Sequence, residues 1–338
     1  MFKFILTGLG IMGFSVAATA STIYIENCEQ LQDIGLTSET LNGYYLQSAD
    51  IDCSEIPNFT PIGDALFPFT GYYNGLGHEI TGLTINNTTS TGLFGFISGA
   101  HISFVGLVDY EITGGTGPGT AYYEATGALI GYAEHSIIDE SYARNGIVKG
   151  TNNTGGLIGQ IFSTAVSNTD TTSDVFSQNY TGGLIGSATG GYDGPSIISK
   201  SYASGRVESQ YDTGGLIGFA YNDVEISNSY ASGDVVGRFN TGGLIGELGF
   251  STIKDSYAIG KIIGSTDSQG LGGLVGNSLG SNLASAVYWD TETSGTVVSA
   301  EGEGRTTNQM KLIDSSESIY EGWDPEVWYF EVGQYPTL

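Results

Sequence analysis

The hydrophobic residues of this 338-residue chain come in short bursts, separated by glycine and small polar residues. No burst keeps the helical spacing of i, i+3, i+4 and i+7 for more than one turn. In residues 216–244, for example, the apolar runs are brief and alternating, and glycine, asparagine, aspartate or serine ends each of them. Such runs are typical of short strands joined by tight turns. The pattern therefore predicts an all-β protein.

One six-residue phrase, Thr-Gly-Gly-Leu-Ile-Gly, organises these runs. Four copies are identical, three are looser, and the steps between their leucines are 27 to 36 residues. A period near 30 residues indicates a repeat array in which each unit buries its apolar face against its neighbours. The identical copies begin at residues 154, 181, 213 and 241, and the looser copies begin at residues 91, 126 and 271.

Three strands and three turns fit a unit of this length, which makes each unit one coil of a parallel β-solenoid. Stacked coils place each strand about 4.8 Å above its equivalent in the previous coil, so like residues form ladders. The spacing predicts about eight coils. It also predicts that the leucines of the phrase form one inward-pointing column.

A second phrase, Ser-Tyr-Ala, recurs in the other half of the unit. The copy that follows Leu157 lacks it and carries Asp170 where the tyrosine is expected. A column of tyrosines on a flat face has two interpretations, a structural ladder or a platform on which sugar rings stack. The gap at Asp170 speaks against a continuous platform. The tyrosines of this column are Tyr142, Tyr202, Tyr230 and Tyr257.

Together the two phrases resemble the GLUG motif of bacterial secreted and surface proteins. The motif is also found in adhesins and in the non-catalytic part of some IgA-cleaving metalloproteases. Residues 46–78 resemble the segment that opens such arrays, and residues 287–336 resemble the segment that closes them. The resemblance implies a right-handed β-solenoid outside the cell and implies little about activity.

The first residues predict a secretory signal. Lys3 precedes an apolar run over residues 4–18, and an Ala-x-Ala site at 18–20 predicts a mature chain from Ser21. A membrane anchor is the alternative, but the run is short for a span of about 20 residues. The sequence offers no other candidate span. The expected divisions are a signal peptide at 1–20, an N-terminal cap and first coil at 21–90, the repeat solenoid at 91–288 and a C-terminal cap at 289–338.

Cys28 and Cys53 are the only cysteines. An even pair in an exported chain predicts a disulfide, which here would secure the first turn of the solenoid. The alternative is a two-cysteine metal site, which lacks nearby histidines.

Charge is strongly negative and unevenly placed. The formal net charge is −26, removal of Lys3 would make it −27, and no lysine or arginine lies between residues 4 and 143. Such a field repels nucleic acid and anionic membranes and favours cations such as Ca²⁺. A calcium-loop spacing begins at Asp290, although an ordinary turn is the alternative. The expected Ca²⁺ ligands are Asp290, Glu292, Ser294 and Glu301, and no cofactor is expected to be required.

The sequence favours a protein without catalysis. A zinc peptidase needs His-Glu-x-x-His, and the only His-Glu pair, at 78–79, lacks the second histidine. A Gly-x-Ser-x-Gly elbow fails at Ile253. Carboxylate pairs suited to glycosidases would arise by chance in so acidic a chain.

The combined prediction is a secreted or cell-surface scaffold for adhesion or extracellular-matrix contact. Its expected partners are an extracellular glycan or the surface of a host or neighbouring cell, and its coils could stack on those of other copies. The alternatives are a carbohydrate-binding module or a polysaccharide-active enzyme on the same fold. An ice-binding protein is a further alternative, but its regular threonine rows are lacking here.

Overall fold

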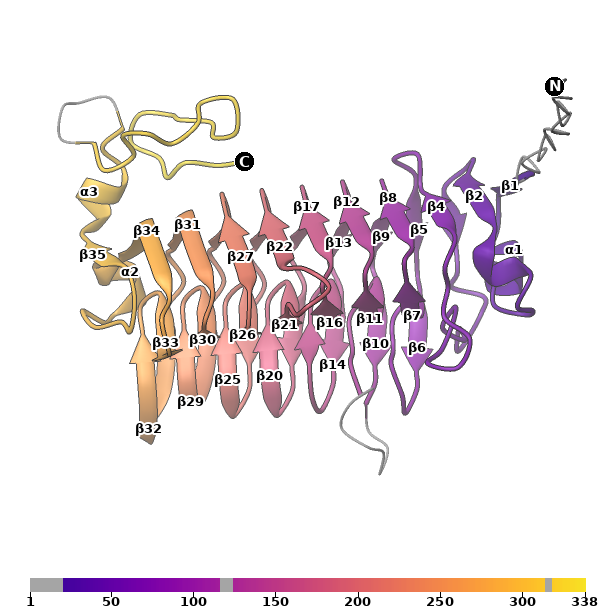
Figure 1. The fold of residues 1–338 in the computed structure, drawn as a ribbon, viewed down its shortest axis with the longest axis horizontal. Helices are drawn as coiled ribbons and strands as arrows, with labels where there is room; N and C mark the ends of the chain where they lie inside the picture. Colours follow the sequence, from indigo (N-terminus) through magenta and orange to yellow (C-terminus); the bar gives the residue numbers. More distant parts are fainter. Residues whose placement is uncertain (1–20, 116–123, 314–317) are drawn as a thin grey trace, which may run out of the picture.

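The computed structural model describes residues 21–115, 124–313 and 318–338, so the expected signal peptide lies outside the described residues. Parallel strands stack as a β-solenoid of about eight turns, with very little helix (Figure 1). The predicted fold is confirmed. The strands form three sheets that run along the solenoid, which we name A, B and C.

Sheet A begins near the N-terminal end and continues almost to the C-terminal one. Its ladder starts at β1 and ends at β35, so parallel pairing extends into both of the segments expected to be caps. The strands of sheet A are β1 (Thr22–Ile25), β2 (Tyr44–Gln47), β3 (Ile51–Asp52), β4 (Tyr72–Asn74), β5 (Glu79–Thr81), β8 (His101–Ser103), β9 (Gly106–Val108), β12 (Ile137–Asp139), β13 (Tyr142–Arg144), β17 (Ala165–Ser167), β18 (Asp170–Thr171), β22 (Ser196–Ser199), β23 (Tyr202–Ala203), β27 (Val224–Ser227), β28 (Tyr230–Ala231), β31 (Thr252–Ala258), β34 (Leu283–Asp290) and β35 (Glu303–Arg305).

Sheets B and C complete each coil. Sheet B contains β7 (Phe94–Ser98), β11 (Ile130–Glu134), β16 (Ile158–Phe162), β21 (Ile185–Thr189), β26 (Ile217–Tyr221), β30 (Ile245–Gly249) and β33 (Val275–Leu279). Sheet C contains β6 (Thr84–Asn86), β10 (Glu111–Thr113), β14 (Ile147–Lys149), β15 (Thr154–Gly155), β19 (Asp174–Phe176), β20 (Asn179–Gly182), β24 (Val207–Glu208), β25 (Tyr211–Gly214), β29 (Val235–Gly242) and β32 (Ile262–Gly272).

The leucines of the repeated phrase form the predicted column. The amide of Leu184 donates to the carbonyl of Leu216 at 2.9 Å, and the amide of Leu216 donates to the carbonyl of Leu244 at 2.9 Å. Each of these side chains is fully buried. The ladder therefore aligns like residues in the interior, as the sequence period predicts.

At Gly215, the second glycine of one copy of the phrase, the interior is too narrow for a side chain. A Cβ built on Gly215 would lie 2.1 Å from the carbonyl oxygen of Gly243 and 2.9 Å from the Cβ of Ala231. Ala231 is the alanine of a Ser-Tyr-Ala phrase, so the two repeated phrases meet across the interior. Real Cβ atoms do not approach a backbone oxygen so closely, and only glycine fits.

The serine of the Ser-Tyr-Ala phrase satisfies buried backbone groups. The amide of Ser201 donates to Oγ of Ser229 at 3.3 Å, and the amide of Ser229 donates to Oγ of Ser256 at 3.2 Å. The hydroxyl of Ser229 donates in turn to the carbonyl of Ser227. Buried polar groups are stable only with such partners, so a small hydroxyl residue belongs at each of these turns.

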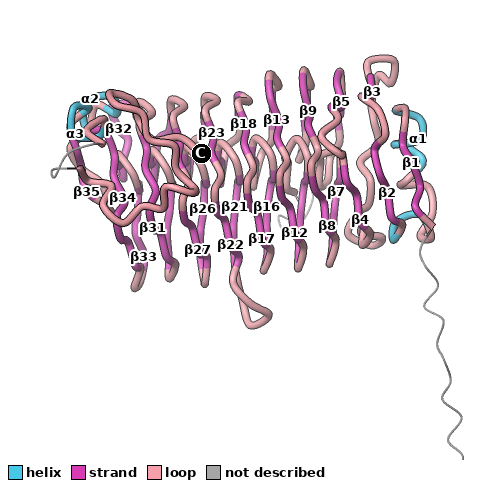
Figure 2. Tube along the Cα trace, turned by 90° about the horizontal axis from the view of Figure 1, so that it is seen from above, coloured by secondary structure: helices cyan, strands magenta, loops and turns pink. Residues whose placement is uncertain are grey.

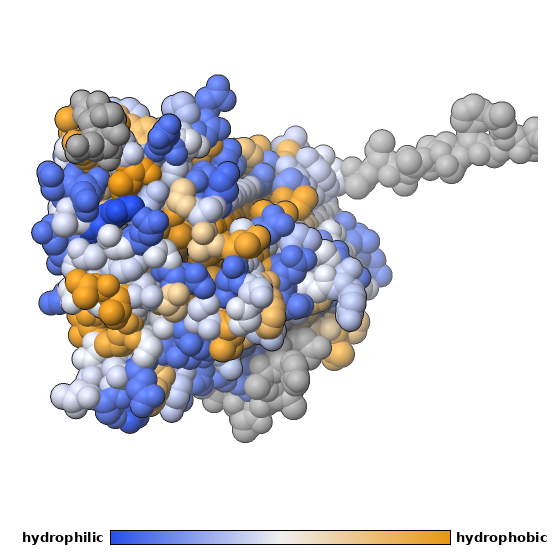
Figure 3. All heavy atoms as spheres, turned by 60° about the vertical axis from the view of Figure 1, so that its left-hand side comes forward, coloured by the Kyte–Doolittle hydropathy of each residue, from blue (hydrophilic) through white to orange (hydrophobic). Residues whose placement is uncertain are grey.

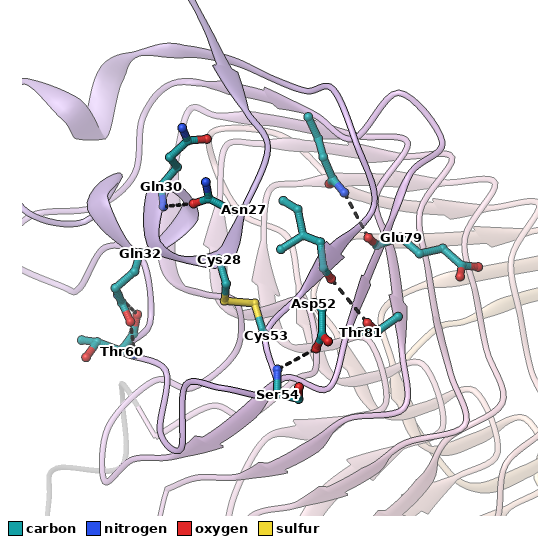
Figure 4. Close-up of a disulfide and its surroundings, with 12 residues drawn as sticks. Asn27, Cys28, Gln30, Gln32, Asp52, Cys53, Ser54, Thr60, Glu79 and Thr81 are labelled. Carbon is teal, nitrogen blue, oxygen red and sulfur yellow. Dashed lines mark hydrogen bonds between the residues drawn. A yellow bond between two sulfur atoms is a disulfide. The ribbon is translucent and has the colours of Figure 1, made fainter.

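The N-terminal end is closed by a helix and a disulfide. Helix α1 (Cys28–Asp33) is capped by Asn27, whose side chain accepts from the amide of Gln30 at 2.9 Å. The disulfide joins Cys28 to Cys53, just after β3, as predicted (Figure 4). A 3₁₀ turn, η1 (Thr40–Asn42), follows α1.

At the other end, α2 (Thr291–Ser294) and α3 (Thr307–Met310) lead into a C-terminal segment, residues 318–338. Figures 1 and 2 show this segment lying along sheet A beside β31 and β34. Leu283, Val297 and Val298 are exposed, and Figure 3, which turns this end of the molecule forward, shows hydrophobic patches among hydrophilic residues. Within the described ranges, none of the helices has the length and hydropathy needed to cross a bilayer.

Candidate functional sites

The four predicted tyrosines lie in one column on the outer face of sheet A. Tyr142 is in register with Asp170, which is in register with Tyr202. The column continues through Tyr230 to Tyr257. The structure therefore brings all four together and places Asp170 in the gap that the repeat alignment predicts.

The rings of this column cover one another. The centroids of Tyr202 and Tyr230 are 4.8 Å apart with an interplanar angle of 1°, and those of Tyr230 and Tyr257 are 5.0 Å apart at 2°. Burial raises the pKa of Tyr230, and the nearby Tyr202 adds to that shift. A sugar ring stacks on a free aromatic face, and these faces are occupied by neighbouring rings. The geometry fits a structural ladder better than a platform.

The gap in the column is filled by an ion pair. Nε of Arg144 donates to Oδ2 of Asp170 at 2.9 Å, and a terminal nitrogen of the same guanidinium donates to Oδ1 at 2.8 Å. The guanidinium also lies 4.1 Å from the ring centroid of Tyr142. Sequence reasoning missed this pair, although Arg144 stands two residues after Tyr142 and therefore points to the same face.

The first tyrosine of the column is anchored at its hydroxyl. Tyr142 donates to Oε1 of Glu79 at 2.8 Å, across the coil that carries Gly106. Burial, followed by this carboxylate, raises the pKa of Tyr142 to about 12. The phenol is therefore neutral at physiological pH and acts as a hydrogen-bond donor.

The last of the four predicted tyrosines is covered by the C-terminal segment, and Tyr288 follows it in register on β34. Trp328 lies 5.9 Å from Tyr257 between ring centroids, and its Nε1 donates to Oδ1 of Asn228 at 3.1 Å. Trp323 packs beside Trp328 at 4.6 Å. Tyr257 is only 1% exposed, so it cannot contact a ligand.

The predicted calcium loop is organised around Asp290 as a helix cap. Its Oδ1 accepts from the amides of Glu292 at 2.8 Å and Thr293 at 3.1 Å. Its Oδ2 accepts from the hydroxyls of Thr307 at 2.7 Å and Tyr335 at 2.5 Å. The buried carboxylate thus ties α2 to α3 and to the C-terminal segment.

The other expected ligands are engaged separately. Glu292 accepts from the amide of Thr307 at 2.9 Å, Ser294 donates to a carbonyl two residues on, and Glu301 accepts from the hydroxyl of Ser278 at 2.7 Å. Among the residues that the structure describes, no three His, Cys, Asp or Glu side chains are grouped to hold a metal ion. Calcium binding at this loop stays a prediction.

A carboxylate pair that sequence reasoning did not single out lies at the corner between sheets B and C. Nδ2 of Asn240 donates to Oδ1 of Asp212 at 2.8 Å and to Oε2 of Glu247 at 3.0 Å. Burial, with repulsion from Glu247 as a smaller cause, raises the pKa of Asp212 to about 6. Asp212 precedes one copy of the repeated phrase and Glu247 follows the next copy, so only the coil register brings them together.

Comparison with known proteins supports the repeat assignment. The family model described as the GLUG motif matches residues 177–208 and 209–236. Halomucin from Haloquadratum walsbyi is 32% identical over an alignment 245 positions long, which covers 59% of this chain but only 2% of Halomucin. The chain therefore spans a very small part of that relative.

The fold is found in a solved structure. A crystal structure from Bacteroides ovatus that carries the name of an immunoglobulin A1 protease superposes with a TM-score of 0.62 at 18% identity, covering 93% of this chain and 91% of its own. A chain named IgA1 Protease gives a TM-score of 0.48 at 13% identity over 78% of this chain and 21% of its own.

The period, the register and the motif match agree on the class of this molecule: it is a β-solenoid protein that contains GLUG-motif repeats. The comparisons support a repeat protein. The identity to the Bacteroides ovatus structure is too low to say more than that the fold is shared.

Proposed function

We propose that this protein is a secreted or cell-surface scaffold that contacts an extracellular glycan or another cell surface, without catalysis of its own. The observation that carries the proposal is the unbroken parallel ladder of sheet A from β1 to β35. A ladder of this kind makes a stiff rod that is long compared with its width, so it has a long surface. Such a rod suits a protein that holds binding surfaces at a set spacing and presents them to a partner.

Charge and sequence support an extracellular setting. The net charge of −26 keeps copies of the chain apart and soluble. The expected signal peptide at 1–20 would bring the chain out of the cytoplasm. The Cys28–Cys53 disulfide is stable in the oxidising environment outside the cytoplasm. The exposed apolar residues at the C-terminal end would allow contact with another copy or a partner.

The proposal is tested by localisation and adhesion together. Protease treatment of intact producing cells should degrade the protein, and beads coated with the mature protein should attach to glycan-bearing cells or matrix. Beads coated with an unrelated protein of similar acidity serve as the control. Degradation only after lysis, or equal attachment of both bead types, would refute the proposal.

A polysaccharide-active enzyme is the second candidate, and the Asp212–Glu247 pair is what favours it. A carboxylate with a pKa of about 6 beside a second carboxylate is the combination that general acid catalysis needs. Release of reducing sugar from any polysaccharide, lost in Asp212→Asn, would establish this candidate.

Calorimetry with and without Ca²⁺ tests the loop at Asp290, where an unchanged melting temperature would remove the metal hypothesis.

A further inference from the structure

A cavity of about 770 Å³ lies near the N-terminal end of the solenoid. Its wall is formed by the chain that follows α1, the loop at 60–67, the turn at 87–90 and Glu124. This volume falls within the range of about 300–1,000 Å³ that is typical of small-ligand sites. Apart from Glu124, the lining belongs to the part of the chain that precedes the first copy of the repeated phrase, so its shape is not copied in the coils that follow.

One side of the cavity presents apolar side chains held on a tight turn. Leu66 is 83% exposed and Phe67 is 59% exposed. Oδ1 of Asp64 accepts from the amides of both residues, at 2.8 and 2.9 Å, and the amide of Asp64 donates to the carbonyl of Phe67 at 3.0 Å. The turn is therefore fixed by hydrogen bonds while its large apolar side chains face solvent. An exposed aromatic ring on a fixed turn is suited to contact the C–H face of a sugar.

Glu124 supplies a polar group with unused capacity. The residue is only 7% exposed, and its Oε2 accepts from Nδ2 of Asn152 at 3.2 Å. Its Oε1 is buried and has no hydrogen-bond partner among the described residues. A buried carboxylate oxygen without a donor costs free energy, so a ligand hydroxyl that meets Oε1 after a rotation of the Glu124 side chain toward the cavity would relieve that cost.

The charge of the cavity restricts what it accepts. No lysine or arginine lies between residues 4 and 143, which includes the whole lining. Carboxylates of Asp64 and Glu124 are present instead, and anionic ligands such as uronates or phosphates would be repelled. Hydroxyl side chains offer further donors and acceptors, and those in the lining include Thr37, Ser38, Thr60, Thr88 and Thr89.

We propose that this cavity binds a neutral saccharide, with Phe67 and Leu66 against its apolar face and Glu124 accepting from one of its hydroxyls. The inference rests on the proposed function, because it identifies the glycan partner by chemistry and assigns its site. A neutral sugar satisfies each feature at once: it has an apolar C–H face, it donates hydrogen bonds, and it carries no negative charge.

The test measures glycan binding by the mature protein and by two pairs of variants. A glycan array selects neutral ligands, and calorimetric titration with the best oligosaccharide gives the affinity. Phe67→Ala and Glu124→Gln should each weaken binding at least tenfold. The matched controls are Tyr192→Ala, which removes a fully exposed aromatic ring outside the lining, and Glu225→Gln, which neutralises an exposed carboxylate on β27. Both controls should bind as the original protein does.

Melting temperatures of all four variants establish that they are folded before their affinities are compared. The proposal is overturned if no neutral glycan binds, if only anionic glycans bind, or if Phe67→Ala and Glu124→Gln bind as well as the controls. The bead-adhesion assay runs in parallel. Attachment of beads without any glycan binding would reject this site and leave the scaffold function standing, whereas absence of attachment with intact saccharide binding would reject the adhesion function and keep the site.

Discussion

The central coils and the first coils of this solenoid share one ladder but fill it differently. Around the repeated phrase the interior is built from leucine, isoleucine, valine, alanine and glycine. In the first coils it contains large aromatic side chains that are also fully buried. These aromatic residues are Tyr45, Phe59, Phe69, Tyr73 and Phe94.

This difference shows that the parallel ladder does not depend on which side chains pack inside it. Hydrogen bonds between coils set the strand spacing in both regions, whatever the side chains. Small residues let the central coils close tightly at the Gly215–Ala231 contact. Aromatic residues need more room, and the first coils accommodate them with longer loops, a helix and a disulfide. The cavity that we assign to a saccharide lies in this irregular region.

The largest effect is expected at a close backbone contact in the central coils. Gly215→Val should destabilise the protein by at least about 3 kcal/mol, because its side chain would collide with the carbonyl of Gly243 and the methyl of Ala231. Chemical denaturation measures the change, and a loss of soluble protein would also agree with it.

The matched substitution in the first coils is Gly35→Ala. A Cβ there would lie no closer than 3.7 Å to any neighbour, so we expect a change within about 0.5 kcal/mol. Equal destabilisation by the two substitutions would contradict the assignment of the cost to the close contacts around Gly215.

Removal of the disulfide is expected to have the next largest effect. The double substitution Cys28→Ser and Cys53→Ser should cost about 3 kcal/mol, because a cross-link over 25 residues restricts the unfolded chain. Hydrogen exchange should accelerate in β1 to β5 while β20 to β30 stay protected. Uniform acceleration along the whole chain would show that the first coils are not a separate unit of stability.

Two threonines of the central phrase offer a smaller and opposite pair of effects. Thr213 is buried and its Oγ1 has no partner in the described chain, so Thr213→Val should stabilise by about 1 kcal/mol. Oγ1 of Thr154 donates to the carbonyl of Asn152 and to Oγ of Ser177, so Thr154→Val should destabilise by about 1 kcal/mol. Thermal denaturation of both variants distinguishes them, and a shift of the same sign in both would contradict this assignment.

The smallest effect concerns pH. The pKa of Asp212 is raised to about 6 from 3.8, so its charged form is disfavoured in the folded state and stability is lost as pH rises through 6. Asp212→Asn keeps an acceptor for Asn240 and removes the charge that faces Glu247 and Tyr180. We expect the variant to gain less than about 1 kcal/mol over the original protein above pH 7, because solvent screens a part-buried group.

The gain should vanish near pH 4, where Asp212 is already protonated in the folded protein. Melting temperatures at several pH values test this. A gain that is equal at pH 4 and pH 8 would contradict the assigned cause.

The sequence predicts what repeats, because a period fixes the register. The leucine column, the tyrosine column and the gap at Asp170 are all consequences of spacing, and the disulfide follows from a single pair of cysteines. Contacts between unlike segments could not be predicted in this way. The cavity forms where three loops meet Glu124, and Asp212 reaches Glu247 only through the exact offset of one coil. The position of the C-terminal segment is a contact of this kind, because Trp328 packs on the face of sheet A against Tyr257.

Each coil contacts only the coils next to it. The length of this molecule can therefore change by whole coils. A tandem duplication of residues 213–240 would add one turn that begins and ends at the same phase of the repeat. It would move the saccharide cavity about 4.8 Å farther from the C-terminal aromatic cluster and leave the surroundings of both unchanged. The distance between the two ends of the molecule is thus set by the number of turns.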